Sequence, residues 1–383
     1  MTADLVVFGE DWGAHPSSTQ HLVRRLARDR KVVWINSIGM RRPRLDGHDL
    51  RRAFGKASVL LGGGPRKTDR NAPERSALAA PPAGLSVHSV AAIPAPASRA
   101  AFALNRTLLS RQVHRLMQQR GITRPVLWTS LPTALPVVGE LGERAVVYYC
   151  GDDFGALAGV DHAPVLEMED RLVQRADLIF AASDVLARRF PAAKTRLLPH
   201  GADITLFSTP APRAAELPAA PRIAGFYGAI ADWIDVPLIA AVARAMPDWQ
   251  FVLVGPVATD IGALDGVANV TLVARQPHAR LPGFTQYWDV SMMPFRNCPQ
   301  ILAANPLKLR EYLAAGTPIA TTPFPALRPY RDLVAVGEGT DGFCAAIRSA
   351  AADRGRDGDR RRRVAGESWD GRAAELNAAL DAL

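Results

Sequence analysis

The sequence Asn305-Pro306-Leu307-Lys308-Leu309-Arg310-Glu311-Tyr312-Leu313-Ala314-Ala315-Gly316 predicts one short helix with a marked start and a marked end. Asn305 is a favoured N-cap residue, and Pro306 suits the first helical position. Gly316 can take the left-handed conformation with which helices commonly end. Leu309 and Leu313, four residues apart, give the helix an apolar stripe.

Lys308 and Glu311 are three residues apart and therefore share a face of this helix. The free N–H groups and positive dipole end of a helix N-terminus attract anions, and a lysine one turn in adds a full charge. A carboxylate one turn further on can accept hydrogen bonds from a sugar diol. The pattern fits a nucleoside diphosphate, with the phosphates at the helix start and the ribose on Glu311. The alternative is a surface helix whose exposed Lys–Glu pair contributes only about 0.2–0.5 kcal/mol.

The sequence around this helix resembles the nucleotide-sugar site of GT-B glycosyltransferases. The resemblance is carried by Asp289–Phe295, Asn305–Lys308 and Glu311–Ile319. It is closest to the group-1 (GT4-like) branch and to bacterial exopolysaccharide and teichuronic-acid transferases. In that family the lysine contacts the diphosphate and the glutamate contacts the ribose, which implies these roles for Lys308 and Glu311. The donor-binding residues expected on this basis are Gly228, Arg275, Gln276, His200, Asn305, Pro306, Leu307, Lys308 and Glu311.

Composition indicates a folded chain of two domains. The 383 residues are too many for one ordinary core, and 48% of them are hydrophobic and 22% charged. Cys150, Cys298 and Cys344 have no paired spacing, so we expect free thiols in a reducing compartment and no structural metal. The N-terminus lacks the basic region of a signal peptide, and no apolar run is as long as a membrane-spanning helix. We therefore expect a cytoplasmic protein.

The net charge of +9 is concentrated between Arg24 and Arg75. An anionic membrane surface is one partner that suits such a patch, which would place the protein peripherally on the inner membrane face. A solvated surface without a partner is the alternative. Nucleic acid is not an expected partner, because the patch has no interleaved aromatic residues and no recognised nucleic-acid motif.

Two series of short apolar strands alternate with helices along the chain, which predicts α/β architecture with parallel sheets. The first series is expected at Leu5–Phe8, Val32–Ile35, Leu85–Val90, Val126–Thr129, Ala145–Tyr149, Leu178–Ala182 and Arg196–Leu198, with a weaker candidate at Val59–Leu61. The second is expected at Ile223–Tyr227, Phe251–Val254, Val270–Val273, Val290–Met293, Ile319–Thr321 and Val334–Val336.

Three segments outside the strands also carry expectations. The segment Ala100–Gln119 is predicted to be a helix with an apolar stripe through Leu108, Leu109, Gln112 and Leu116. The Pro- and Ala-rich segment Pro210–Pro221 is predicted to be a linker, and Arg354–Arg363 a solvated, charge-dense segment.

The resemblance implies the GT-B fold, in which two Rossmann-like domains face each other across a cleft. We expect an acceptor-binding domain over residues 1–205 and a nucleotide-sugar-binding domain over residues 206–365. The helix formed by residues 366–383 is expected to cross back to the first domain, as it does in that fold. Ligands of parallel α/β sheets bind at the carboxyl ends of the strands.

The string Gly225–Asp235 follows the first strand of the second domain and resembles a Gly-Ala-Ile, Trp-x-Asp string of bacterial polysaccharide transferases. Gly228 would allow the backbone to approach a phosphate closely, although a simple tight turn also explains a glycine there. Arg275 and Gln276 follow another strand, where the resemblance implies that the backbone contacts the base; Arg275 is alternatively a plain surface residue.

The string Tyr148–Phe154 ends a buried strand with the carboxylates Asp152 and Asp153. A carboxylate at the carboxyl edge of a sheet can take the proton of an acceptor hydroxyl that attacks the anomeric carbon. Both aspartates are alternatively turn residues. Inverting glucuronosyltransferase-like relatives use a first-domain aspartate as base, and on that likeness we favour Asp152, with Asp153 capping the next turn.

The chain departs from the retaining group-1 pattern. Those enzymes carry Glu-x7-Glu, and the position eight residues before Glu311 is Ala303. No Asp-x-Asp of the kind that holds a metal–diphosphate follows a strand. We therefore expect an inverting, metal-independent reaction without a cofactor, in which Lys308 and the helix dipole stabilise the leaving group.

The remaining candidates have structural alternatives of equal or greater weight. His200 lies at the crossing between the domains, where it either contacts the donor or is structural. His15, Ser17 and Ser18 follow the first strand on the acceptor side, where a serine is also a plain N-cap. Trp12 and Trp233 are more readily packing residues than sugar-stacking ones.

The function expected is transfer of a sugar from a nucleotide donor, a uridine diphosphate sugar, to a hydroxyl of a glycan or lipid-linked saccharide in cell-surface polysaccharide synthesis. Two alternatives remain open. One is a nucleotide-sugar epimerase of the same fold, which needs no acceptor. The other is a non-catalytic nucleotide-sugar-binding protein.

Overall fold

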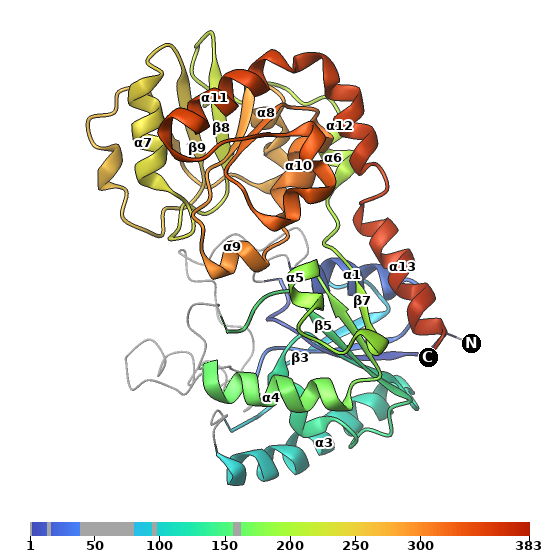
Figure 1. Ribbon diagram of the computed structural model, residues 1–383. Helices are drawn as coiled ribbons and strands as arrows, with labels where there is room; N and C mark the ends of the chain where they lie inside the picture. The colour runs from blue at the N-terminus through green and yellow to red at the C-terminus, as the bar shows by residue number, and fades with distance from the viewer. Residues whose placement is uncertain (1, 14–16, 39–79, 94–97, 156–161) are drawn as a thin grey trace, which may run out of the picture. The chain divides into compact units, whose positions relative to one another are not determined.

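A computed structural model describes residues 2–13, 17–38, 80–93, 98–155 and 162–383 of the chain. This part of the chain divides into two compact units, Met1–Pro199 with Arg372–Leu383, and His200–Gly371. Each unit contains one parallel sheet covered by helices, so the predicted α/β class is confirmed (Figure 1). The candidate strand Val59–Leu61 lies outside the described residues.

The sheet of the first unit has seven strands in the order β3-β2-β1-β4-β5-β6-β7, and all of its strand pairs are parallel. Its strands are β1 (Leu5–Phe8), β2 (Val32–Ile35), β3 (Leu85–His88), β4 (Val126–Thr129), β5 (Ala145–Cys150), β6 (Leu178–Ala181) and β7 (Thr195–Leu197). Its helices are α1 (Ser18–Leu26), α3 (Arg99–Arg120), α4 (His162–Arg175), α5 (Asp184–Ala187), the 3-10 helices η1 (Pro132–Val137) and η2 (Ala192–Lys194), and most of α13 (Trp369–Asp381).

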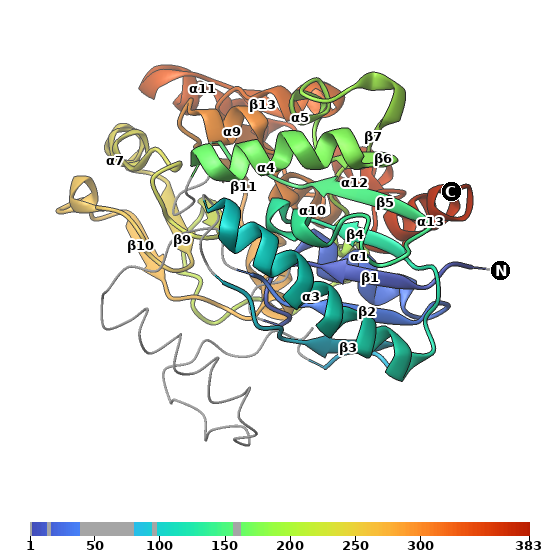
Figure 2. The same cartoon turned by 90° about the horizontal axis from the view of Figure 1, so that it is seen from below.

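The central strands of this sheet consist almost entirely of buried side chains. All residues of β1, β2, β4 and β5 are buried, which is typical of parallel strands whose two faces are both covered. Helices α3 and α4 lie on one face of the sheet, and α1 and α13 on the other (Figures 1 and 2).

The C-terminal helix α13 is fixed to the first unit by a buried guanidinium. The Arg30 side chain is fully buried, and its Nη2 donates to Asp381 Oδ1 at 2.5 Å and to Asn377 Oδ1 at 2.8 Å. Leu376 and Leu380 on the same helix are also fully buried. The predicted return of the C-terminal helix to the first unit is therefore confirmed.

The sheet of the second unit has six parallel strands in the order β10-β9-β8-β11-β12-β13. They are β8 (Ile223–Tyr227), β9 (Gln250–Val254), β10 (Val270–Val273), β11 (Val290–Met293), β12 (Ile319–Thr321) and β13 (Ala335–Val336). The helices are α6 (Ile204–Ser208), α7 (Val236–Ala245), α8 (Pro282–Thr285), α9 (Pro299–Ala303), α10 (Leu307–Ala315), α11 (Gly339–Ala352), α12 (Asp357–Val364), and the 3-10 helices η3 (Gly262–Leu264), η4 (His278–Arg280), η5 (Pro325–Leu333) and η6 (Arg354–Arg356). Helix α7 packs with α11, while α10 packs with α6, α8 and α12.

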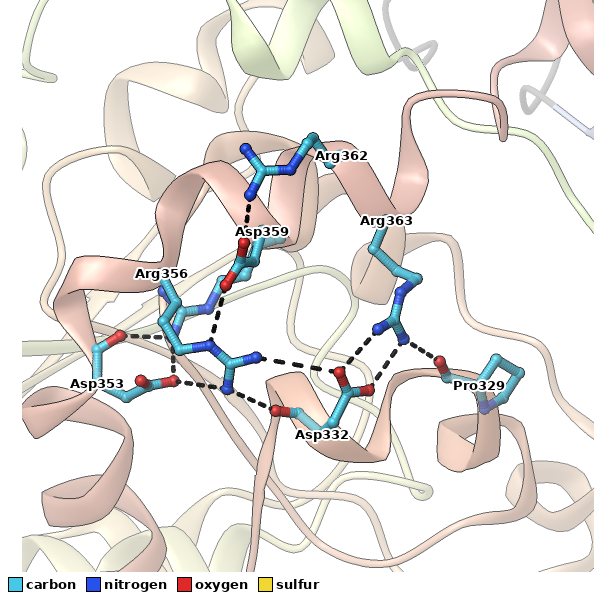
Figure 3. Close-up of polar contacts among 8 residues, drawn as sticks. Pro329, Asp332, Asp353, Arg356, Asp359, Arg362 and Arg363 are labelled. Carbon is cyan, nitrogen blue, oxygen red and sulfur yellow. Dashed lines mark hydrogen bonds and ion pairs between the residues drawn. The ribbon is translucent and has the colours of Figure 1, made fainter.

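The sequence predicted that Arg354–Arg363 is a solvated segment, and this prediction is wrong. The segment forms η6 and most of α12. Its arginines bind carboxylates and carbonyls of neighbouring segments, and Figure 3 shows this network. Arg363 forms a bidentate pair with Asp332 at 2.9 and 2.7 Å, and Arg356 donates to the backbone oxygen of Asp332 at 2.8 Å. These bonds join η6 and α12 to η5.

Two arginines of α12 also bind the C-terminal end of α10. Arg360, which is 1% exposed, donates to the backbone oxygen of Gly316 at 3.4 Å and to Asp353. Arg361 donates to the backbone oxygen of Ala315 at 3.1 Å. The helix ends as predicted, because Gly316 is left-handed with φ 84°. Guanidinium groups at a helix C-terminus are favourable, since they satisfy free carbonyls and complement the dipole.

Two further sequence expectations differ from the structure. The buried stripe of α3 runs through Ala101, Asn105, Leu109, Val113 and Met117, while Leu108 is 38% exposed. The segment Pro210–Pro221 is not a linker but packs on the second unit, with Ala214 and Leu217 in its core.

No helix in the described ranges is long and apolar enough to cross a membrane. Cys150, Cys298 and Cys344 are free thiols, and Cys150 and Cys344 are buried.

Substitution of Gly225 in β8 by alanine is expected to destabilise the second unit, because the new Cβ would lie 0.9 Å from a ring carbon of Trp288. We expect the free energy of unfolding to fall by about 1–3 kcal/mol or more, as is typical of an overpacked core. Gly355→Ala is the matched control, since its Cβ would meet nothing within 4 Å. Urea denaturation of both variants measures the difference, and equal stability would contradict this packing.

Candidate functional site

The candidate site lies at the carboxyl edge of the second sheet. The strand order reverses direction between β8 and β11, and such a switch point is where α/β sheets bind ligands. The loop after β8 begins at Gly228, the loop after β10 carries His278, and α10 follows β11 through α9. Three segments that are far apart in the sequence therefore supply the site.

The start of α10 carries no side-chain cap, and the predicted N-cap role of Asn305 is wrong. The N-cap residue is Pro306, which makes no side-chain cap hydrogen bond. Asn305 Oδ1 instead accepts a hydrogen bond from Arg310 Nη1 at 2.7 Å. Because proline has no side-chain acceptor, the first N–H groups of α10 remain available to an anion.

Lys308 is the second residue of α10 and is partly buried. Its Nζ is 5.6 Å from the centre of the Phe226 ring, and within the described ranges it has no hydrogen-bond acceptor or ion-pair partner. Burial lowers the pKa of the Lys308 ammonium, and the charge of Glu311 opposes that effect. A cation in this position is stabilised by a bound anion.

Gly228 is the residue that allows Lys308 to reach the sheet edge. Its φ is +131°, and a Cβ at this position would lie 2.4 Å from Lys308 Cε and 2.8 Å from Lys308 Nζ. The backbone N–H of Gly228 donates to Val254 O at 2.8 Å, which fixes the loop after β8. Both the backbone conformation and the close approach of the lysine therefore require glycine here.

Glu311 is 6% exposed and has both carboxylate oxygens engaged. Tyr227 Oη donates to Oε2, and His278 Nε2 lies 2.9 Å from Oε1. Burial lowers the pKa of His278, but the hydrogen bond that His278 donates to Glu311 and the charges of Glu311 and Asp203 outweigh burial and raise the pKa overall. Burial and the Glu311 charge raise the pKa of Tyr227 well above its usual value, so the phenol remains a donor.

Tyr227 and His278 were not singled out from the sequence. Tyr227 is the last residue of β8, and His278 follows β10 by five residues, so both lie at the carboxyl edge of the sheet. This position at the carboxyl edge was the one sequence signal that could have marked them as site residues. Their meeting on Glu311 depends on the sheet topology, which no local pattern contains.

The other predicted donor-binding residues do not take part in the contacts around Glu311 described above. Arg275 is exposed, and Gln276 accepts a hydrogen bond from Arg280 Nη1 at 2.6 Å. His200 is partly buried at the start of the second unit. Leu307 is the first residue of α10, next to Lys308.

In the first unit, Asp152 and Asp153 follow β5 and have different surroundings. Asp153 Oδ1 accepts hydrogen bonds from Arg189 Nη1 at 2.7 Å and from the backbone N–H of Gly155 at 2.9 Å. Asp152 is exposed, although protein around it displaces enough water to raise the pKa of its carboxyl. Because Asp153 Oδ1 is held by Arg189 and by the backbone of Gly155, Asp152 is the more available of the two carboxylates for the predicted role of base.

A buried network that the sequence analysis missed lies behind this loop. Glu169 is 1% exposed and accepts hydrogen bonds from Tyr148 Oη at 2.5 Å and Arg189 Nη2 at 2.9 Å. Arg189 therefore links the buried Glu169 to Asp153, which anchors the segment that carries Asp152.

Residues after β1 mainly stabilise the local turn. Ser17 is the N-cap of α1 and also donates to Glu10 Oε2 at 2.8 Å, while Ser18 hydrogen-bonds Tyr149. Burial and the nearby charges of Asp152 and Asp11 raise the pKa of Glu10, against the lowering effect of its backbone bond and of Ser17.

Trp12 packs edge-on against Trp34 with ring centres 4.9 Å apart, while His15 lies outside the described residues. The described residues hold no group of three or more His, Cys, Asp or Glu side chains arranged to bind a metal ion.

Solved structures with the same arrangement cover essentially the whole chain. Sucrose-phosphate synthase from Thermosynechococcus elongatus matches 99% of this chain and 98% of its own, with a TM-score of 0.67 and 17% identity. Anabaena Alr3699/HepE in complex with UDP matches 99% of this chain and 100% of its own, with a TM-score of 0.67 and 14% identity. An Escherichia coli trehalose-6-phosphate structure with UDP-2-fluoro glucose matches 100% of this chain and 99% of its own, with a TM-score of 0.66 and 12% identity.

The chain has the GT-B fold. In sequence it is similar to Bacillus subtilis (strain 168) TuaH, a protein named as a glycosyltransferase of teichuronic acid biosynthesis, with 30% identity over 225 residues. That match spans 53% of this chain and 56% of TuaH, so it covers about half of each protein. No protein-family model matches the chain. Within the GT-B fold, Lys308 and Glu311 occupy the C-terminal unit that the sequence resemblance indicated.

Proposed function

We propose that this GT-B protein is a glycosyltransferase that moves a sugar from a nucleotide sugar, a UDP-sugar, to a hydroxyl of a glycan or lipid-linked saccharide. The observation that carries the proposal is the ammonium of Lys308, which has no ion-pair partner among the described residues, beside a start of α10 that has no side-chain cap. The name of TuaH supports the class of enzyme. The UDP bound to HepE and the UDP-2-fluoro glucose bound to the E. coli protein support the class of donor.

The donor site follows from the geometry of the second unit. Lys308 and the first N–H groups of α10 bind the diphosphate, because both present positive charge to one point. The Gly228 backbone approaches the phosphates without a side chain in the way. Glu311 accepts hydrogen bonds from the ribose hydroxyls, and the Arg275–Gln276 segment contacts the base.

The proposed reaction is a single displacement. Asp152 takes the proton from the acceptor hydroxyl, whose oxygen then forms a bond to the anomeric carbon. The bond from that carbon to the diphosphate oxygen breaks, and the diphosphate leaves with the electron pair. Lys308 and the α10 dipole stabilise the charge on the leaving group, so the proposed reaction is metal-independent. Attack on the face opposite the diphosphate inverts the anomeric centre.

Ala303 supports inversion over the retaining group-1 route. It occupies the position of the first glutamate of Glu-x7-Glu, and it is a buried residue at the end of α9. A methyl group at this position cannot provide the hydrogen bond or charge that a glutamate would supply.

We propose that the enzyme associates with an anionic membrane surface that holds its lipid-linked acceptor. The basic patch between Arg24 and Arg75 falls largely outside the described residues, but α3 offers a second surface. Leu104 and Leu108 are 59% and 38% exposed, and Arg111 and Arg115 continue the same helical crest. Helix α3 has no acidic residue. Exposed leucines flanked by arginines suit an anionic lipid interface.

Lys308→Ala is expected to weaken binding of UDP about 10–100-fold, because it removes a charge-assisted contact to the diphosphate. Isothermal titration calorimetry with UDP measures the effect. Lys31→Ala is the control, since Lys31 is an exposed lysine of the first unit. Unchanged affinity in Lys308→Ala would refute the donor site.

Asp152→Asn is expected to lower kcat for sugar transfer about 100–10,000-fold, the usual contribution of a general base. Asp153→Asn should have a much smaller effect, because Asp153 is held by Arg189 and Gly155. Release of UDP is measured with and without acceptor, and nuclear magnetic resonance assigns the configuration of the product.

Three outcomes would change this assignment. Full transfer by both aspartate variants would remove the proposed base. UDP-sugar isomerisation without acceptor would identify an epimerase. Donor binding without turnover on any glycan would favour a non-catalytic binding protein.

The double variant Leu104→Ser/Leu108→Ser is expected to sediment less with liposomes containing phosphatidylglycerol than wild type does, because it removes apolar side chains that insert into the interface. Leu197→Ser is the matched control, since Leu197 is 40% exposed on β7 of the same unit. Equal sedimentation with neutral and anionic liposomes would contradict the membrane proposal.

A further inference from the structure

We propose that His278 and Tyr227 are positioning residues that hold the Glu311 carboxylate in the orientation that binds the donor ribose, and that His278 makes ribose recognition depend on pH. This inference rests on the donor half of the proposed function. It adds two residues and a regulatory property to that site.

Glu311 is clamped from two sides. Its Oε2 accepts from Tyr227 Oη at the end of β8, and its Oε1 pairs with His278 Nε2 in η4 at 2.9 Å. Each carboxylate oxygen has two acceptor positions, so one remains on each oxygen. Those two positions can accept the two hydroxyls of a ribose diol without loss of either clamp. A carboxylate without these donors would be free to rotate and would lose orientational entropy on binding.

Tyr227 is fixed independently of the ligand. It is 5% exposed, and its ring meets Tyr312 edge-on at 5.2 Å and stacks on Phe207 at 6.1 Å. Its backbone N–H donates to Tyr312 Oη at 3.1 Å. Since burial and the charge of Glu311 raise the pKa of Tyr227 well above its usual value, its hydroxyl remains a donor at all physiological pH values.

His278 is the variable half of the clamp. Its side chain is 49% exposed, so it exchanges protons with solvent. Its ring meets the edge of Phe207 at 5.4 Å, which restricts its orientation. The titratable groups that face it are Glu311 from α10 and Asp203, the N-cap of α6, while Tyr227 from β8 acts through Glu311.

The sign of the pH dependence follows from these contacts. The two carboxylates outweigh burial and raise the pKa of His278, so the imidazolium persists above the usual pKa of a histidine. Below this raised pKa the bond to Glu311 is charge-assisted, and above it a neutral N–H donates a bond of about half the strength. Glu311 is therefore held most firmly at pH values below the pKa of His278. Discrimination between ribose and deoxyribose decreases as the pH rises through that pKa.

The experiment compares the affinities of UDP and 2′-deoxyuridine 5′-diphosphate by calorimetry between pH 6 and pH 9. The two ligands carry the same base and diphosphate, so the ratio of their dissociation constants reports the 2′-hydroxyl alone. Titration of the diphosphate cancels in this ratio, as does the contribution of Lys308. The variants are His278→Ala, His278→Gln, Tyr227→Phe and Glu311→Gln, with Lys308→Ala as the control.

For wild type we expect UDP to bind about 10–100-fold more tightly than the deoxy ligand at pH 6, with a smaller ratio at pH 9. His278→Ala and Tyr227→Phe should reduce the ratio at pH 6 to about threefold, and Glu311→Gln should nearly abolish it. His278→Gln should restore much of the ratio without pH dependence, because a glutamine amide donates a hydrogen bond but does not titrate. Lys308→Ala should weaken both ligands and leave the ratio unchanged.

Several results would overturn the inference. A wild-type ratio of one shows that Glu311 does not bind the ribose 2′-hydroxyl and overturns the proposed clamp on the diol. A ratio and pH profile in His278→Ala equal to those of wild type show that His278 does not position Glu311, although the donor site then stands. If wild type binds neither nucleotide, the donor half of the proposed function fails and the inference fails with it. Thermal melting of each variant separates loss of folding from loss of recognition.

Discussion

The placement of the Lys308 ammonium is the constraint around which the candidate site of the second unit is arranged. Lys308 lies partly buried against the Phe226 ring, and the described chain provides it with no ion-pair partner. The start of α10 adds further positive potential at the same place, because Pro306 offers no acceptor to the first N–H groups. Gly228 in the neighbouring loop has no side chain, which leaves room for the end of the Lys308 side chain. Each feature alone is unfavourable or neutral in the free protein, and the proposed diphosphate would satisfy all of them.

Much of the architecture was predictable because it depends on local apolar runs. Strands such as Leu5–Phe8 and Val32–Ile35 are buried on both faces, so their sequences are continuously hydrophobic and easily found. The spacing of Lys308 and Glu311 likewise places both on one helical face. The GT-B assignment, which came from resemblance, agrees with the structural comparisons.

Features that depend on tertiary partners could not be predicted in this way. Asn305 is a good cap by type, but Arg310 engages its side-chain oxygen. The Arg-rich segment of α12 was expected in solvent because its composition is polar, whereas carboxylates and carbonyls from η5 and α10 receive its guanidinium groups. The clamp on Glu311 joins residues from three segments, and only the strand order brings them together.

Side chains hold the two ends of α10 differently, and this asymmetry has a consequence for substitutions far from its N-terminus. Its N-terminal end lacks a side-chain cap, whereas Arg360 and Arg361 hold the carbonyls of its last turn. These arginines belong to α12, which packs on α10, and they bind the end of α10 opposite the proposed donor site. A substitution in α12 that weakened binding at the proposed site would therefore act by displacing α10, since the affected side chain anchors the distant end of that helix.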